Sequence, residues 1–245
     1  MNSLSHYITK FKYQLLVLLS HITFIIYIYI FGGKFLLYSL IVGWITSNLV
    51  HNLYMHRIFT HRHFVIHDWV HGVLMFIFSL LNLGSAAVYA ATHSKHHAFS
   101  GGEGDPHDPK SLGLVKSMCS LWDKNYTPER KILHFLLKTP RTKFYHDHHF
   151  KFAVISSIFS PILIIMSHWL SKIVIVLVHN SRFGYGNNKK DDTSRNIWWL
   201  KFIIWGEELH NNHHNYVAIA NHNIKKNWKE FDLLFYIGNI INKKT

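Results

Sequence analysis

Histidine is concentrated in three short stretches of this sequence. The chain has 22 histidines among 245 residues, far more than folding requires. Eight of them form the clusters HRIFTH, HSKHH and HNNHH, and each cluster borders an apolar stretch. Imidazole is a common ligand of transition metals, so the clusters predict a metal site. The eight are His56, His61, His93, His96, His97, His210, His213 and His214.

The spacing within each cluster suggests how the imidazoles would be arranged. Residues i, i+3 and i+4 share one face of an α-helix, so each HxxHH presents three imidazoles together. His56 and His61 lie five residues apart, about 140° around a helix of about 3.6 residues per turn. They either sit at a relaxed helix end or serve two different ions. Eight ligands exceed one tetrahedral or octahedral site, and an all-imidazole pair of sites favours redox-active iron over zinc.

Other polar residues are interpreted around these clusters. Asp105 and Glu207 are expected to accept hydrogen bonds from ligand N–H groups and so fix their tautomers. The alternatives are a turn residue for Asp105 and an exposed helix carboxylate for Glu207. His222 is expected at the surface, and the group HDHH, which begins at His146, at a membrane interface.

Long apolar runs must position these residues. Only 16% of the chain is charged, against about 25% in soluble domains. The runs Tyr13 to Gly33 and Phe35 to Met55 contain no charged residue and suit membrane helices of about 20 residues. They predict a membrane hairpin at about 13–55 that turns at FGGK. Basic residues flank both ends, which places the ends in the cytoplasm.

Two further runs complete the expected fold. Trp69 to Ser94 is uncharged, and a second hairpin is predicted at about 145–181. That hairpin is short, because Tyr145 to Arg182 would span about 57 Å as a helix, and Pro161 is expected to kink it. The sequence thus predicts one domain, 1–245, an all-α integral membrane protein with about four transmembrane helices in two hairpins. A cytoplasmic helical cap, 56–144 and 182–245, would hold the histidine-rich two-metal site.

Charge and cysteine content exclude some functions. The net charge is +13, but basic residues lie between apolar stretches rather than in compact runs, which favours membrane-protein loops and no nucleic-acid partner. The single cysteine, Cys119, allows neither an internal disulfide nor a four-cysteine iron–sulfur cluster.

The three clusters resemble a known family. HRIFTHRHF, ATHSKHHAFSGGEGDPHDP and GEELHNNHHN are similar to the three histidine boxes of the membrane acyl-CoA desaturases of the stearoyl-CoA, or delta-9, type. The order HxxxxH, HxxHH, HxxHH is the family's pattern. The DPH beginning at Asp105 and the Gly206–Glu207 pair match as well. The resemblance covers about Leu15 to Tyr216.

This resemblance implies an enzyme. Family members use a cytoplasmic di-iron centre, O₂ and two electrons to introduce a cis double bond into a saturated fatty acyl chain. The eight box histidines would hold the two iron ions. The substrate would be an acyl-CoA or an acyl-lipid, and the electron donor of the cytochrome b5, ferredoxin or flavoprotein type. The membrane would be the bacterial inner membrane or the endoplasmic reticulum.

The resemblance also implies how the elements lie relative to the membrane. All boxes must share one side of the membrane, so Trp69 to Ser94 should lie along the bilayer or dip into it. The acyl chain is expected between the first hairpin and this segment. Lys95, Arg130 and Lys131 face either an anionic headgroup or solvent.

The sequence departs from the family at several points. The family's ninth histidine follows an asparagine by four residues, whereas here VLVHNSRFGYG places His179 directly before Asn180. His179 is the candidate ninth ligand, and Asn180 its candidate supporting residue. Glu208 stands where glycine is usual. Two alternatives stay open: a di-iron lipid hydroxylase, disfavoured by HxxxxH, and a degenerate metal-binding membrane protein without activity, favoured by the short second hairpin.

Overall fold

The fold of the chain is all-helical wherever the structure describes it. The computed structural model describes residues 3–106, 128–180, 182–186 and 192–243; side chains are described from Phe11 onward, except at Ile175. His107 of the DPH motif and Cys119 lie outside these ranges. The elements are α1 Ser3–Thr46, η1 Ser47–Thr60, α2 Asp68–Ser79, α3 Ala86–Phe99, α6 Arg130–Leu136, α7 Pro140–Phe159, α8 Pro161–Val178, η2 Trp198–Leu200, α9 Lys201–Ile204, α10 His210–Asn215 and α11 Leu233–Ile241.

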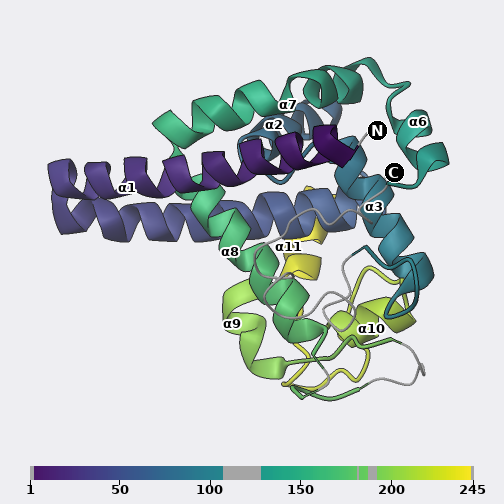
Figure 1. The fold of residues 1–245 in the computed structure, drawn as a ribbon. Helices are drawn as coiled ribbons and strands as arrows, with labels where there is room; N and C mark the ends of the chain where they lie inside the picture. The colour runs from purple at the N-terminus through teal and green to yellow at the C-terminus, as the bar shows by residue number, and fades with distance from the viewer. Residues whose placement is uncertain (1–2, 107–127, 181, 187–191, 244–245) are drawn as a thin grey trace.

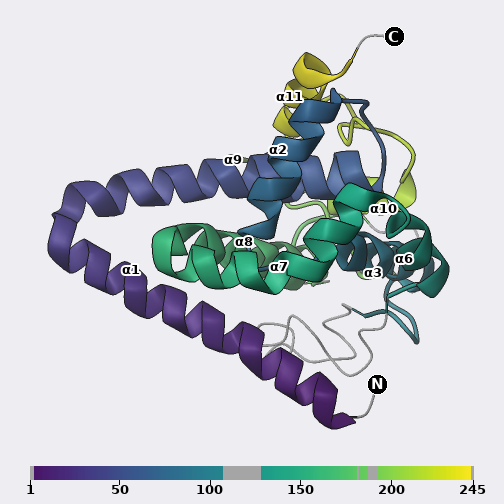
Figure 2. The ribbon, with the colours of Figure 1, turned by 90° about the horizontal axis from the view of Figure 1, so that it is seen from above.

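The first predicted hairpin is present. Helix α1 folds back on itself at Gly32, where φ is 78°, a backbone conformation that glycine adopts without steric cost. Figure 2 shows the two arms of α1 diverging from this turn, with α7 and α8 between them. The stretch Phe11–Thr60 is apolar and long enough to cross a membrane. Side chains such as Phe11, Tyr29 and Phe31 are exposed along it, as a lipid-facing surface requires.

The second predicted hairpin is interrupted where Pro161 was expected to kink it. The chain breaks between α7 and α8 at Ser160, because Pro161 lacks the N–H that would continue the helix, and it begins α8 instead. Within the described residues, Pro161–Val178 is a second stretch long and apolar enough to cross a membrane, whereas α7 does not meet that description. Four membrane-crossing helices therefore stay a prediction.

The two hairpins pack tightly against each other. Phe24 from the first arm of α1 forms an apolar cluster with Ile162 and Ile165 of α8. On the second arm, a Cβ added at Gly43 would lie 2.7 Å from Met166 Cγ. The small residue therefore allows close approach of α8, as at many membrane helix crossings.

The run Trp69 to Ser94 forms two helices rather than one. Helix α2 ends at Ser79, and Ser85 caps α3 by accepting from the Val88 N–H at 3.3 Å. Asn82 and Gly84 between them have positive φ. The two helices have 12 and 14 residues, too few for a hydrocarbon core of about 30 Å. This agrees with the expectation that the run does not cross as one span.

The elements that carry the histidine clusters meet at one end of the molecule. In Figure 1 the arms of α1 extend away from this end, while η1, α3 and α10 converge there. The main apolar core lies around η1 and packs residues of α2, α3 and α11 together, including Tyr54, Phe78, Ala90 and Leu234. This core fixes the relative positions of the first two histidine clusters.

Candidate metal centre

The first cluster lies on a π-helix. Residues 47–60 form η1, and the His61 N–H donates to the His56 carbonyl at 3.1 Å. A π-helix joins residue i to residue i+5, so the two imidazoles share one face, with ring centroids 4.8 Å apart. The reasoning from 3.6 residues per turn was therefore wrong for this segment. Of the two alternatives, the relaxed helix end is the one present, and both histidines enter the same group.

The second cluster divides between two groups. His93 and His97 lie one helical turn apart on α3, and their Nε2 atoms are 2.9 Å apart. His93 Nε2 also lies 3.0 Å from His61 Nε2. His96 faces elsewhere, with its ring centroid 4.9 Å from that of His179. One turn of helix thus supplies side chains to two separate sites.

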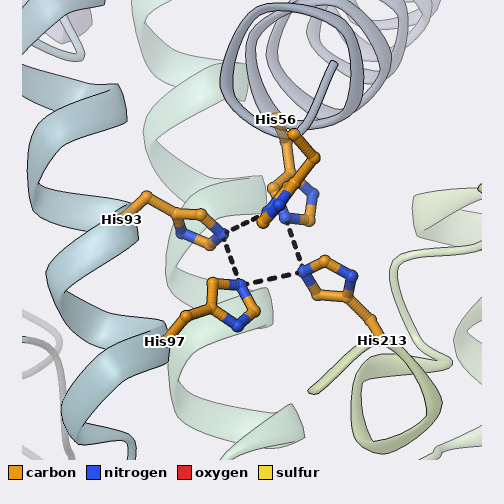
Figure 3. Close-up of side chains that lie close together, drawn as sticks. His56, His93, His97 and His213 are labelled. Carbon is orange, nitrogen blue, oxygen red and sulfur yellow. Dashed lines mark hydrogen bonds between the residues drawn. The ribbon is translucent and has the colours of Figure 1, made fainter. Parts of the chain in front are cut away.

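The third cluster divides in the same way. His213 Nε2 of α10 lies 3.0 Å from the Nε2 atoms of both His56 and His97. Figure 3 shows His56, His93, His97 and His213 pointing toward one another from η1, α3 and α10. His210 and His214 belong to the other group, with Nε2 atoms 3.1 Å apart.

His179 joins the second group although its sequence context is unusual. It follows the last residue of α8, and its Nε2 lies 2.9 Å from His210 Nε2. The Asn180 side chain instead accepts from the Arg182 N–H at 3.0 Å, so it shapes the turn after α8. All nine candidate histidines therefore enter two groups. One has five members, His56, His61, His93, His97 and His213; the other has four, His96, His179, His210 and His214.

The donor sets suit metal ions. Within each group the ligand atoms all lie within 4.8 Å of one another, and ligands on opposite sides of one ion are about 4 Å apart for metal–nitrogen bonds of about 2.0–2.1 Å. The Nε2 atoms approach each other at about hydrogen-bond distance, yet a neutral imidazole whose Nδ1 carries its proton has only a lone pair at Nε2. Converging lone pairs repel unless a cation lies between them.

Two carboxylates contact the outer nitrogens of these histidines. His56 Nδ1 lies 2.6 Å from Glu207 Oε2, and His96 Nδ1 donates to Asp105 Oδ1 at 2.8 Å. Both carboxylates are buried. A carboxylate on Nδ1 fixes the proton there and directs the Nε2 lone pair inward. The exposed-carboxylate alternative for Glu207 is therefore wrong. Asp105 also accepts from the Gly101 N–H at 2.9 Å, so it stabilises a turn as well.

A third carboxylate, which the sequence pattern did not indicate, contacts the four-histidine group. Asp192 Oδ2 lies 3.2 Å from His214 Nδ1, and Ser100 Oγ donates to Asp192 Oδ1 at 3.0 Å. Asp192 stands in a polar stretch, KKDDTS, where nothing distinguishes it from a solvated loop residue. Only the folding of 192–196 beside α10 reveals its role.

Burial favours the neutral form of most of these histidines. It lowers the pKa of His61 and of His179 to about 3 and holds that of His93, His97, His210 and His213 well below its usual value, and neighbouring histidines add to the effect. A neutral imidazole is the form that binds a metal. These histidines are therefore in the form that binds a metal near neutral pH.

Two residues near the centre differ from their sequence interpretation. Arg57, counted among the basic flanks of the first hairpin, is fully buried and paired with Glu207 and Asp232. His222, expected at the surface, is buried and contacts the His213 ring at 4.7 Å. The positive-inside count treats every arginine near a helix end as a loop charge, and nothing in ANHN signals burial.

The remaining histidine group lies apart from the centre. His146 Nδ1 is 2.7 Å from Ser85 Oγ, and the His149 side chain is hydrogen-bonded to Tyr13. Neither belongs to the two histidine groups. They link α7 to α1 and to the start of α3, which is a packing role.

Comparison with known proteins supports a family assignment. Delta-9 acyl-lipid desaturase 1 of Arabidopsis thaliana is 28% identical over 199 residues, 74% of this chain and 64% of the relative. The sn-1 stearoyl-lipid 9-desaturases of Synechocystis sp. and Anabaena variabilis are each 29% identical, over 82% and 80% of this chain and 65% and 76% of the relatives. No family model matches the chain.

The match covers only part of the length of these relatives. The chain spans slightly less than two thirds of the length of the first two relatives. The similarity nevertheless covers most of this chain, and the chain has the three histidine clusters in the family's order. The chain is therefore similar to acyl-lipid and stearoyl-lipid desaturases over most of its length.

Proposed function

We propose that the protein is an O₂-dependent di-iron desaturase that introduces a cis double bond into a saturated fatty acyl chain. The observation that carries the proposal is the pair of histidine groups, five and four imidazoles whose Nε2 atoms converge. Two iron ions held there would supply the oxidising chemistry, with O₂ as co-substrate and two electrons from an external donor. An all-imidazole donor set without thiolate favours iron over structural zinc.

An acyl-lipid is the substrate form that we propose. The relatives are named for acyl-lipid and stearoyl-lipid substrates, and the described residues include two apolar stretches of membrane-crossing length. An acyl chain that is already part of a membrane lipid reaches the site from the bilayer. Acyl-CoA is the alternative carrier, and product analysis of the lipid fractions separates the two.

A pocket beside the five-histidine group offers room for the acyl chain. It has a volume of about 350 Å³ and is mostly apolar; its lining comes from the end of η1, from α3 and from α6. Ser94 and Arg62 in its wall directly follow His93 and His61 in sequence. The pocket shares Ala90 and Ser94 with the segment that was predicted to border the acyl passage, whereas its other lining residues follow the first hairpin or belong to α6. The lining residues are Phe59, Thr60, Arg62, Ala90, Ser94, Lys131, Ile132, Phe135 and Leu136.

The charges at this pocket suit an anionic group. Arg62 and Lys131 are its charged lining residues, and both are basic. The Arg62 guanidinium lies over the Phe135 ring at 5.8 Å, which holds it beside the apolar wall. We propose that these two residues meet a phosphate-bearing headgroup while the acyl chain enters the pocket. Lys95 and Arg130 do not line it.

Expression in a strain that requires unsaturated fatty acids tests the proposal. The expected result is growth without the supplement and cis-monounsaturated chains in the lipids. His213→Ala removes a shared contact of the five-histidine group and should abolish both results, with the protein still present in the membrane. A hydroxylated product would instead support the hydroxylase alternative. Less than about two irons per chain in the purified wild-type protein, with no product, would support the degenerate alternative.

A further inference from the structure

A fully buried arginine lies directly behind the five-histidine group. Arg57 follows His56 on η1 and is the largest fully buried side chain among the described residues. Its Nε donates to Glu207 Oε1 at 2.7 Å, and its Nη1 donates to Asp232 Oδ2 at 2.8 Å and Oδ1 at 2.9 Å. A buried charge is stable only when it is paired and hydrogen-bonded. The two carboxylates together meet that requirement.

Glu207 connects this arginine to a predicted metal ligand. Its Oε1 accepts from Arg57, while its Oε2 lies 2.6 Å from His56 Nδ1. The His56 ring therefore ends a line of contacts that runs from Asp232 through Arg57 and Glu207. Every member of this line is buried. A change at one end is consequently felt at the other with little screening by solvent.

Asp232 comes from a part of the chain that the histidine boxes do not include. It follows Tyr216, where the family resemblance ends, and begins helix α11 by accepting from the Phe235 N–H at 3.1 Å. Its Oδ2 also accepts from the His222 N–H at 2.9 Å. The backbone of Gly206 lies so close that a Cβ there would collide with Asp232 Oδ1. The aspartate is thus held in one place by several independent contacts.

We propose that Asp232 is a positioning residue for the five-histidine metal site, acting through Arg57 and Glu207 on His56. The segment 222–232 then belongs to the metal centre and is more than a terminal extension. Without the Asp232 carboxylate, the whole attraction of Arg57 would act on Glu207. Glu207 would accept less strongly from His56 Nδ1–H, and His56 would become a weaker ligand. The inference rests on the proposed metal centre.

The geometry makes this effect selective for one site. His56 belongs to the five-histidine group, whereas the carboxylates Asp105 and Asp192 contact His96 and His214 of the other group. Loss of Asp232 should therefore perturb one metal and leave the other unchanged. General loosening of the fold would perturb both.

The test uses the full-length protein loaded with ⁵⁷Fe and Mössbauer spectroscopy, with iron affinity measured by chelator competition. In Asp232→Asn, the expected result is an altered signal from one iron and an affinity about 10–100-fold lower at that site, with the other site unchanged. Glu207→Gln should alter the same signal in the same direction. Asp192→Asn should alter the other signal.

Glu230→Gln is the matched control. Glu230 lies in the same segment and is fully buried, but it accepts from Asn212 and Tyr185 rather than from Arg57. This variant should lower thermal stability without a site-selective change. The inference is overturned if Asp232→Asn leaves both iron signals as in the wild type. It is also overturned if Asp232→Asn alters both signals equally, as a general loss of stability would. Should Asp232→Asn not fold, Arg57→Lys takes its place, because it keeps the charge but removes the Nε contact to Glu207. A wild type that binds no iron would instead contradict the proposed function.

Discussion

Asp105 offers a direct test of how the four-histidine group is held. Its carboxylate accepts from His96 Nδ1–H at 2.8 Å and from the Gly101 N–H at 2.9 Å, in a buried position. Asp105→Asn keeps the shape of the side chain but leaves one acceptor oxygen for the two donors, His96 Nδ1–H and Gly101 N–H. Its NH₂ group then faces one of these donors. A hydrogen bond to a charged group contributes about 1.5–3 kcal/mol. At about 1.4 kcal/mol per tenfold change, the expected loss of metal affinity is about 10–100-fold, as for other residues that support metal ligands.

The assay is a titration of metal-free protein in detergent with Fe²⁺ against a competing chelator, which resolves two classes of site. Asp105→Asn should weaken only the site that contains His96. Glu103→Gln, an exposed change in the same loop, is the control and should behave as the wild type. Equal weakening of both sites, or affinities indistinguishable from the wild type, would refute the assigned role of Asp105.

Three further outcomes follow from the same structure. Ile132→Trp fills the proposed acyl pocket, so desaturation should fall at least tenfold (about 1.4 kcal/mol) while iron content stays at the wild-type value; loss of iron instead would mean that the pocket supports the fold. Gly43→Ala places a Cβ 2.7 Å from Met166 Cγ and should destabilise the protein by about 1–3 kcal/mol, whereas Gly33→Ala meets no atom within 4 Å and should not; equal melting temperatures would contradict this. The pKa values of His61 and His179 are lowered to about 3 in the folded chain. Below about pH 6.5 these histidines therefore take up protons in the unfolded chain but not in the folded chain. The free energy of unfolding of the metal-free protein should consequently fall by about 1.4 kcal/mol per pH unit for each such histidine between pH 6.5 and pH 5. Glu207 and Glu208, whose pKa burial raises to about 7 and about 8, act in the opposite direction but are outnumbered by the histidines; denaturant melts at pH 7 and pH 5 measure the net sign, and equal or higher stability at pH 5 would contradict it.

Periodicity and composition were enough to predict the first hairpin and its turn. Each uncharged run beside FGGK has the length of one membrane-crossing helix. The helix reverses at Gly32, within the predicted turn. The order of the clusters likewise predicted that η1, α3 and α10 would meet. In each case the signal is local: a run of apolar residues, or a histidine spacing that repeats a helical turn.

The division of the histidines into two groups was beyond that reasoning. In HSKHH, residues i and i+4 serve one group and i+3 the other, a choice made by the neighbouring helices and not by the spacing. The pairing of His56 with His61 depends on a π-helix, and the cluster HRIFTH does not distinguish a π-helix from an ordinary helix end. Helix propensity differs too little between the two for sequence alone to decide.

The charged residues behind the histidines were the least predictable. Arg57 stands at the end of an apolar run, where a basic residue usually flanks a membrane helix. It is buried because Glu207 and Asp232, 150 and 175 residues away, converge on it. Asp192 and His222 likewise acquire their roles only through long-range contacts. A single sequence carries no mark of such contacts.

The most direct test of the central claim is the fate of a deuterated saturated fatty acid in cells that express the protein. The account predicts a membrane lipid whose acyl chain has lost two deuterium atoms and contains one cis double bond, with no added oxygen. His213→Ala should leave the fatty acid unchanged. An acyl chain that carries an added hydroxyl group, or an unchanged chain in cells whose protein is iron-loaded, would contradict the account.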